Sequence, residues 1–212
     1  MPPQLIIFDC DGILVDSEPL SNSMFIDALA EIGFSMTMEE CRDLFVGRSP
    51  ENNIETIERM LGSPLPKDFL VDLGKKTDAA FEQYLRPVPG IESALREITF
   101  PVCVASSSPP EMILENLRRT GLLPRFEGRI FSATQVVNGK PAPDLFLHAA
   151  QVMKAPAESC AVIEDSVAGV QAGTSAGMTV FAYTGTFSAD SLKDAGAHIV
   201  FDDMRQLPEL LD

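Results

Sequence analysis

Apolar and polar residues form alternating blocks along most of the chain, and the blocks have the lengths of strands and helices. Short apolar runs rich in β-branched and aromatic residues end abruptly at polar or turn-forming residues, as buried strands of a parallel sheet do. These runs lie at residues 5–8, 101–105, 130–132, 160–163, 178–182 and 197–201. Helical periodicity occurs between them, at residues 91–98, 112–119 and 145–153 and after Ser166. Repeated strand–helix units predict an α/β protein with a parallel sheet.

The alternation stops between residues 17 and 87, where only helical patterns occur. An apolar stripe ends at Gly33, and Thr37 with Glu40 forms a capping-box pattern at the start of a second helix. Two further helices are predicted at about residues 51–61 and 67–85. We therefore predict two domains, an all-helical insertion of residues 17–87 and an α/β core of residues 1–16 and 88–212.

Side chains suited to chemistry follow three of the predicted strands. They are Asp9 and Asp11, Ser106 and Ser107, and Glu164 and Asp165. Ligands of open α/β sheets bind at the carboxyl ends of the strands, so these groups are expected to share one site. Carboxylates from two strands are hard oxygen ligands suited to Mg²⁺. Serine hydroxyls, backbone N–H groups and the ammonium of Lys140 can bind phosphoryl oxygens, so the set suits phosphoryl transfer.

Each of these signals also has a simpler structural explanation. Asp-x-Asp is common in turns, and serines after a strand usually cap helices. A lysine before proline is usually a solvated surface residue, and Glu164-Asp165-Ser166 is a favourable helix start. The order of the signals, each beside a strand end or a helix start, favours a common site over coincidence.

Composition and charge limit the classes of function. The 212 residues carry a formal net charge of −15, which argues against nucleic-acid binding through a basic surface. The four cysteines, without metal-type spacing, are expected to be buried and reduced. We see neither a signal pattern nor a long apolar run, so we expect a cytoplasmic protein without membrane contact.

The four motifs resemble those of the haloacid dehalogenase (HAD) superfamily of hydrolases, in the branch with a helical cap inserted after the first strand. Residues 9–18 are similar to the first motif and residues 105–107 to the second. Residues 139–144 are similar to the third, and residues 163–173 to the fourth. The resemblance implies a Rossmann-like (HAD) parallel-sheet core with an inserted α-helical cap domain.

The resemblance also implies a role for each motif residue. Asp9 would be the nucleophile that forms an aspartyl phosphate, and Asp11 the general acid and base. Magnesium would be held by the Asp9 carboxylate, the Asp11 carbonyl and Asp165, with Glu164 in or beside the metal shell. The phosphoryl group would be bound by Ser106, the Ser107 backbone and Lys140, which is also counted as catalytic.

Within the superfamily, the acid at Asp11 argues against the dehalogenases and against phosphonoacetaldehyde hydrolase. β-Phosphoglucomutases of similar architecture carry a histidine in the first cap helix, where this chain has Ser21. A cap loop of Gly47, Arg48 and Ser49 is expected to face the substrate. Arg48 could bind a second anionic group such as a sugar-acid carboxylate, or be a solvated loop residue.

The leading hypothesis is a magnesium-dependent phosphatase that hydrolyses a small phosphorylated metabolite. A sugar phosphate or a sugar-acid phosphate such as 6-phosphogluconate is expected, because several core segments are similar to those of bacterial 6-phosphogluconate phosphatases. The alternatives are a β-phosphoglucomutase-like phosphosugar mutase and a catalytically silent HAD-fold binding protein. We expect a monomer, with a dimer as the alternative.

Overall fold

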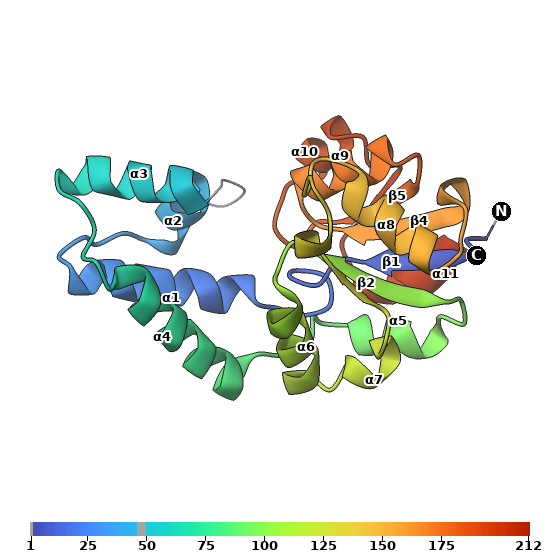
Figure 1. Ribbon diagram of the computed structural model, residues 1–212, viewed down its shortest axis with the longest axis horizontal. Coiled ribbons are helices and arrows are strands. Elements are labelled where there is room, and N and C mark those ends of the chain that lie inside the picture. Colours follow the sequence, from blue (N-terminus) through green and yellow to red (C-terminus); the bar gives the residue numbers. More distant parts are fainter. Residues whose placement is uncertain (1, 46–49) are drawn as a thin grey trace. The chain divides into compact units, whose positions relative to one another are not determined.

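The computed structural model describes residues 2–45 and 50–212 (Figure 1). By their internal contacts the residues divide into two compact units. The core unit comprises Met1–Asp16 and Arg86–Asp212, and the helical unit comprises Ser17–Leu85.

The core unit is built on a six-stranded sheet in which every neighbouring pair is parallel. The strands are β1 (Leu5–Phe8), β2 (Val102–Ser106), β3 (Ile130–Ser132), β4 (Cys160–Glu164), β5 (Thr179–Tyr183) and β6 (Ile199–Phe201). Their spatial order is β3-β2-β1-β4-β5-β6, the order of a Rossmann-like fold. The predicted α/β class is therefore confirmed. The order reverses between β1 and β4, which is where such sheets bind ligands.

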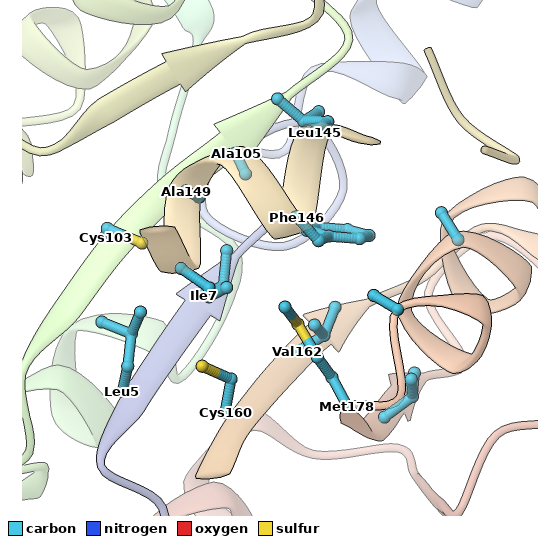
Figure 2. Packing of buried hydrophobic residues seen from close by; sticks show 14 of the residues in the cluster. Leu5, Ile7, Cys103, Ala105, Leu145, Phe146, Ala149, Cys160, Val162 and Met178 are labelled. Atoms are coloured by element: carbon cyan, nitrogen blue, oxygen red, sulfur yellow. The ribbon is translucent and has the colours of Figure 1, made fainter. Parts of the chain in front are cut away.

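Helices cover both faces of this sheet (Figure 1). On one face, α8 (Asp144–Val152) and α9 (Val167–Ser175) bury an apolar cluster that includes Leu5, Ile7 and Val162. Figure 2 shows side chains of β1, β2 and β4 in this cluster beside those of α8. On the other face lie α5 (Ile91–Glu97) and α7 (Leu123–Phe126), and the ring of Phe126 contacts that of Phe8 edge to face, with centroids 5.9 Å apart.

Small residues let α9 approach the sheet closely. A Cβ atom at Gly173 would lie 2.7 Å from Cγ2 of Val180 and 3.5 Å from Cβ of Val162. Only a residue without a side chain fits there, so the glycine sets the spacing between α9 and the strands β4 and β5. This close packing positions the start of α9, which follows directly on Glu164 and Asp165.

The core unit contains further helices, most of them short. They are α6 (Pro110–Arg119), α10 (Ala189–Asp194), α11 (Leu207–Leu211), η1 (Ala133–Gln135), η2 (Ala157–Ser159) and η3 (Met204–Gln206). The hydrophobic pattern did not predict α7, α10 or α11, because helices of four to six residues make too few turns to show a period. None of the helices within residues 2–45 and 50–212 is long and apolar enough to cross a membrane.

The helical unit consists of α1 (Glu18–Glu31), α2 (Met38–Phe45), α3 (Pro50–Leu61) and α4 (Phe69–Tyr84). The predicted capping box starts α2, because the backbone N–H of Glu40 donates to Thr37 Oγ1 at 3.2 Å and the Thr37 N–H donates to Glu40 Oε2 at 2.7 Å. The unit has its own apolar core, formed by Ala28, Leu29, Cys41, Phe45, Ile57 and Phe69.

The two connections between the units run side by side as a short antiparallel ribbon. The Asp16 N–H donates to the Arg86 carbonyl at 2.9 Å, and the Val88 N–H donates to the Leu14 carbonyl at 3.1 Å. Val15 forms the bridge between them with Pro87. The chain therefore leaves and re-enters the core unit at one place, immediately after the turn that carries Asp9 and Asp11.

Candidate active site

The turn after β1 places Asp9 at the centre of the sheet edge. The Asp9 N–H donates to the Ile163 carbonyl at 3.0 Å, which extends the pairing of β1 with β4 by one residue. Gly12 has a φ of +79°, and a Cβ atom there would lie 2.1 Å from Asp165 Oδ2. A glycine is therefore required both by the backbone conformation and by the close approach of Asp165.

Three carboxylates come together at the junction of β1 and β4. Asp9, Glu164 and Asp165 each offer an oxygen within 4.8 Å of the others, and all three side chains are buried. They come from the ends of two neighbouring strands, as the sequence analysis expected. Buried carboxylates this close repel one another unless a cation lies among them.

Lys140 supplies a cation from the loop before α8. Its Nζ donates to Asp9 Oδ1 at 2.7 Å and to Glu164 Oε1 at 2.5 Å, and its side chain is 6% exposed. The ammonium also lies 5.0 Å from the centre of the Phe146 ring. Burial alone would lower the pKa of Lys140, but the negative charges of Asp9 and Glu164 outweigh burial and raise it above its usual value. Lys140 is therefore a fully charged ammonium.

The pKa of Asp9 is raised, whereas a simple ion pair with an ammonium would lower it. Burial raises it to about 7, Lys140 opposes this effect, and the charges of Glu164 and Asp11 add to it. The pKa of Asp9 is thus raised mainly by burial, whereas the pKa of Lys140 is raised by the negative charges of Asp9 and Glu164, which share its ammonium. The excess negative charge fits a site for a further cation, and oxygen-only donors fit Mg²⁺.

Both carboxylate oxygens of Glu164 accept hydrogen bonds. Its Oε2 accepts the N–H groups of Asp165 at 3.0 Å and Ser166 at 2.9 Å, and also the Ser166 hydroxyl at 2.9 Å. Its Oε1 accepts Lys140. A Cβ atom at Gly169 would lie 1.8 Å from Oε1, so the glycine in the first turn of α9 makes room for this carboxylate. These contacts fix Glu164, and through it they fix Lys140.

Asp11 stands apart from the buried carboxylate group and has a partner of its own. Its Oδ2 accepts a hydrogen bond from the Ser108 hydroxyl at 2.9 Å. The two aspartates of the first motif thus have different environments. One carboxylate is buried against an ammonium, and the other is half-buried and held by a hydroxyl.

Asp165 is held from the other side of the sheet edge. Its Oδ2 accepts a hydrogen bond from the hydroxyl of Thr186 at 2.6 Å, and Thr186 lies in the loop after β5.

Cys10 lies between the two aspartates in sequence and is fully buried. Burial raises the pKa of its thiol well above the usual value. All four cysteines are free and buried, and Cys10 cannot serve as a nucleophile at this edge.

The structure places the other predicted site residues as follows. Ser106 is buried at the end of β2, and its Oγ accepts the Ser108 N–H at 3.1 Å. Ser107 is exposed in the following bend. The predicted substrate residues Gly47, Arg48 and Ser49 lie outside the described residues.

Sequence reasoning missed three polar residues of this edge. The predicted site residues do not include Ser108, Ser132 or Thr186. The signal that identified the other groups, a polar residue at or after the carboxyl end of a strand, also applies to Ser132 at the end of β3 and to Thr186 after β5.

Comparison with known proteins agrees with this geometry. The profile of one protein family, haloacid dehalogenase-like hydrolase, matches residues 3–177. The chain belongs to this family. It is 32% identical to the 6-phosphogluconate phosphatase of Escherichia coli K12 over 211 residues, covering 98% of this chain and 94% of that protein.

Further relatives of this HAD hydrolase are similar over most of its length. The phosphorylated carbohydrates phosphatase of Thermotoga maritima is 31% identical over 184 residues, which cover 82% of each chain. The crystal structure of a haloacid dehalogenase-like protein of unknown function from Agrobacterium tumefaciens superposes with a TM-score of 0.89 at 34% identity, covering 98% of this chain and 97% of that one. The family match and the phosphatase relatives together show that the protein is a phosphoric monoester hydrolase.

Proposed function

We propose that this protein is a magnesium-dependent phosphatase that hydrolyses a small phosphorylated sugar or sugar acid, such as 6-phosphogluconate, through an aspartyl-phosphate intermediate. The observation that carries the proposal is the difference between the surroundings of the two aspartates, Asp9 and Asp11. Asp9 is buried beside Lys140 and two further carboxylates, whereas Asp11 lies outside that group on Ser108.

In the first step, a carboxylate oxygen of Asp9 attacks phosphorus. The new O–P bond forms as the bond from phosphorus to the ester oxygen breaks, and the electron pair leaves with that oxygen. The protonated carboxyl of Asp11 gives its proton to the leaving oxygen, so an alcohol departs rather than an alkoxide. Lys140 holds Oδ1 of Asp9, which fixes the carboxylate for attack.

In the second step, water attacks the phosphorus of the aspartyl phosphate. Asp11, now a carboxylate, takes the proton from that water. The P–O bond to Asp9 breaks, its electron pair returns to the Asp9 carboxylate, and inorganic phosphate is released. Ser106, the Ser107 backbone and Lys140 are proposed to bind the phosphoryl oxygens in both steps.

The donor set at this edge fits the metal that the family resemblance implies. We propose that the carboxylates of Asp9 and Asp165 and the Asp11 carbonyl would hold Mg²⁺, with Glu164 beside them. Magnesium, when bound, neutralises negative charge on the phosphoryl group and on the carboxylates around it. The buried excess of carboxylates over ammonium groups supports a divalent cation here.

The substrate class is proposed from the relatives and from the helical unit. Both curated relatives described above are named as phosphatases of phosphorylated carbohydrates or a sugar-acid phosphate. We propose that the helical unit is the cap and that Gly47, Arg48 and Ser49 contact the leaving group. A net charge of −15 supports a small-molecule substrate rather than nucleic acid. We also propose a cytoplasmic monomer that acts without a membrane.

Phosphate release from purified protein tests this function. The panel contains 6-phosphogluconate, hexose 6-phosphates, phosphoglycolate and glycerol phosphate, each with magnesium and with EDTA. We expect magnesium-dependent release that is highest for a sugar or sugar-acid phosphate and is abolished by Asp9→Asn. A protein that releases no phosphate from the whole panel is a silent binding protein and contradicts the proposal.

The same preparation separates hydrolysis from mutase chemistry. A mutase would convert β-glucose 1-phosphate to glucose 6-phosphate when primed with a glucose bisphosphate. Ser21, in place of the histidine of the β-phosphoglucomutases, supports hydrolysis. Formation of glucose 6-phosphate faster than release of inorganic phosphate would favour the mutase.

A further inference from the structure

Ser108 forms hydrogen bonds to three different parts of the site, through its N–H, its carbonyl and its hydroxyl. Its backbone N–H donates to Ser106 Oγ at 3.1 Å, and its carbonyl accepts the Ser132 hydroxyl at 2.8 Å. Its own hydroxyl donates to Asp11 Oδ2 at 2.9 Å. The residue thus ties the turn after β1 to the ends of β2 and β3.

The two serines that hold Ser108 are themselves fixed. Ser106 and Ser132 face each other in the register of β2 and β3, and each is 1% exposed. Ser132 Oγ also accepts the Thr134 N–H at 3.2 Å as the cap of η1. Pro109 follows Ser108 directly and disfavours a helical backbone conformation at Ser108. The hydroxyl of Ser108 is therefore presented from a rigid support.

Capping of the next helix does not explain this hydroxyl. The residue at the N-cap of α6 is Pro109, and α6 begins without a side-chain cap hydrogen bond. Ser108 directs its hydroxyl to Asp11 instead. The function of the side chain has to be sought in what it does to that carboxyl group.

We propose that Ser108 is a positioning residue for Asp11, an inference that rests on the proposed function. Holding Oδ2 fixes the rotation of the carboxyl group and directs Oδ1 toward the reacting oxygens. Oδ2 is an acceptor both when Asp11 is a carboxylate and when the proton is on Oδ1, so the hydrogen bond persists through both steps. A carboxyl group held in this way keeps one orientation for proton transfer throughout the cycle.

The leaving group of the substrate provides the test. An alkyl ester needs a proton on its leaving oxygen, whereas p-nitrophenolate leaves without one. Ser108→Ala should therefore lower kcat/KM for the sugar phosphate that the wild-type enzyme hydrolyses best by about tenfold or more, while kcat/KM for p-nitrophenyl phosphate falls much less. Ser108→Thr keeps the hydroxyl and should restore most of the loss.

Two comparisons isolate the effect on Asp11. Asp11→Asn should show the same dependence on the leaving group, and Ser108→Ala should add little in the Asp11→Asn background. Ser191→Ala, an exposed serine of α10, is the matched control and should leave both kcat/KM values unchanged. Equal losses of kcat/KM for both esters in Ser108→Ala, or no loss for either, would overturn the proposal.

Crystal structures of the same variants give a readout that does not depend on turnover. We expect the Asp11 carboxyl group to rotate or to occupy two orientations in Ser108→Ala and to keep one orientation in Ser108→Thr. A single unchanged orientation in Ser108→Ala overturns the positioning role even if activity falls. Wild-type enzyme that hydrolyses neither ester refutes the proposed function instead, and the crystal structures then decide the role of Ser108.

Discussion

Asp9 and Glu164 share the buried ammonium of Lys140, and the carboxylate of Asp165 lies close to both of them, so negative charge exceeds positive charge at this site. Removing carboxylates from water is costly, and Lys140 compensates only part of the charge. The pKa of Asp9 is raised to about 7 for this reason, with burial as the largest cause. The carboxylate of Asp9 needs a further cation to be ionised fully near neutral pH.

The metal-free protein should consequently lose stability as the pH rises. Between the ordinary pKa of Asp9 near 3.8 and its folded value of about 7, the native state binds a proton that the unfolded chain has released. Stability therefore falls through that interval and stays lower above it. In EDTA, Asp9→Asn should be more stable than wild type at pH 8, by at most about 4 kcal/mol, with little difference at pH 4.

Thermal unfolding of both proteins with EDTA at pH 4, 6 and 8 measures this difference. Magnesium is the control, because a bound cation favours the ionised Asp9 and should remove the advantage of Asp9→Asn at pH 8. An advantage that is the same at all three pH values would show that the buried charge of Asp9 is not its cause.

Thr186 should contribute to metal binding although it offers no carboxylate. Its hydroxyl donates to Asp165 Oδ2 at 2.6 Å and fixes the orientation of that carboxylate. Asp165 is a proposed metal ligand, and loss of the partner of a metal ligand typically weakens metal affinity about 10- to 100-fold. Isothermal titration of Thr186→Val with magnesium should show this loss. Thr184→Val, which removes a hydroxyl bonded to the Phe201 carbonyl, should bind magnesium as wild type does.

At the scale of the elements, α9 depends on a glycine that faces the carboxylate of Glu164. Gly169→Ala would put a Cβ atom 1.8 Å from Oε1 of Glu164, whose two oxygens are already committed to hydrogen bonds. Either α9 or Glu164 must move, at a cost of about 2–3 kcal/mol, and Lys140 loses its support. Gly74→Ala in α4 meets nothing within 4 Å and should instead stabilise by about 0.5–1 kcal/mol.

Urea denaturation of the two alanine variants, with phosphate release measured alongside, checks this pair. A Gly169→Ala protein as stable and active as wild type would mean that α9 does not constrain Glu164.

Elements with a strong local signal could be predicted from sequence, and elements without one could not. The strand Ile130–Ser132 and the Thr37–Glu40 capping box depend on neighbouring residues, and both appear as expected. The helices α7, α10 and α11 are too short to show a period and are formed by packing on the core unit.

The same distinction holds for the site. The strand ends could be predicted to bring Asp9, Glu164 and Asp165 together, because parallel strands place their carboxyl ends at one edge. That Ser108 bonds to Asp11 and Thr186 to Asp165 depends on how loops fold back across that edge. No periodicity in the sequence encodes these contacts.

For the molecule as a whole, the ribbon between the units suggests that the core unit can fold without the helical unit. Asp16 and Arg86 are joined by a backbone hydrogen bond of 2.9 Å, so a short glycine-containing turn could replace Ser17–Leu85. The shortened protein should unfold cooperatively, because the sheet and its covering helices remain intact. We expect it to hydrolyse p-nitrophenyl phosphate but to lose discrimination among sugar phosphates.

Circular dichroism during heating measures whether the shortened protein unfolds cooperatively. Assays with p-nitrophenyl phosphate and with the sugar phosphates measure its activity and its discrimination. A chain that stays unfolded would show that the core unit depends on the helical unit for stability. Undiminished discrimination among sugar phosphates would place substrate selection in the core unit and contradict the proposed role of the cap.

The central position of β1 has a consequence for synthesis on the ribosome. β1 is translated first, yet its two hydrogen-bonding neighbours begin only at Val102 and Cys160. Until β4 emerges, this strand of four apolar residues has at least one unpaired edge. The nascent chain therefore carries Asp9 at the end of an apolar strand that cannot complete its pairing until β4 has been made, so docking of β1 should be a slow step in folding.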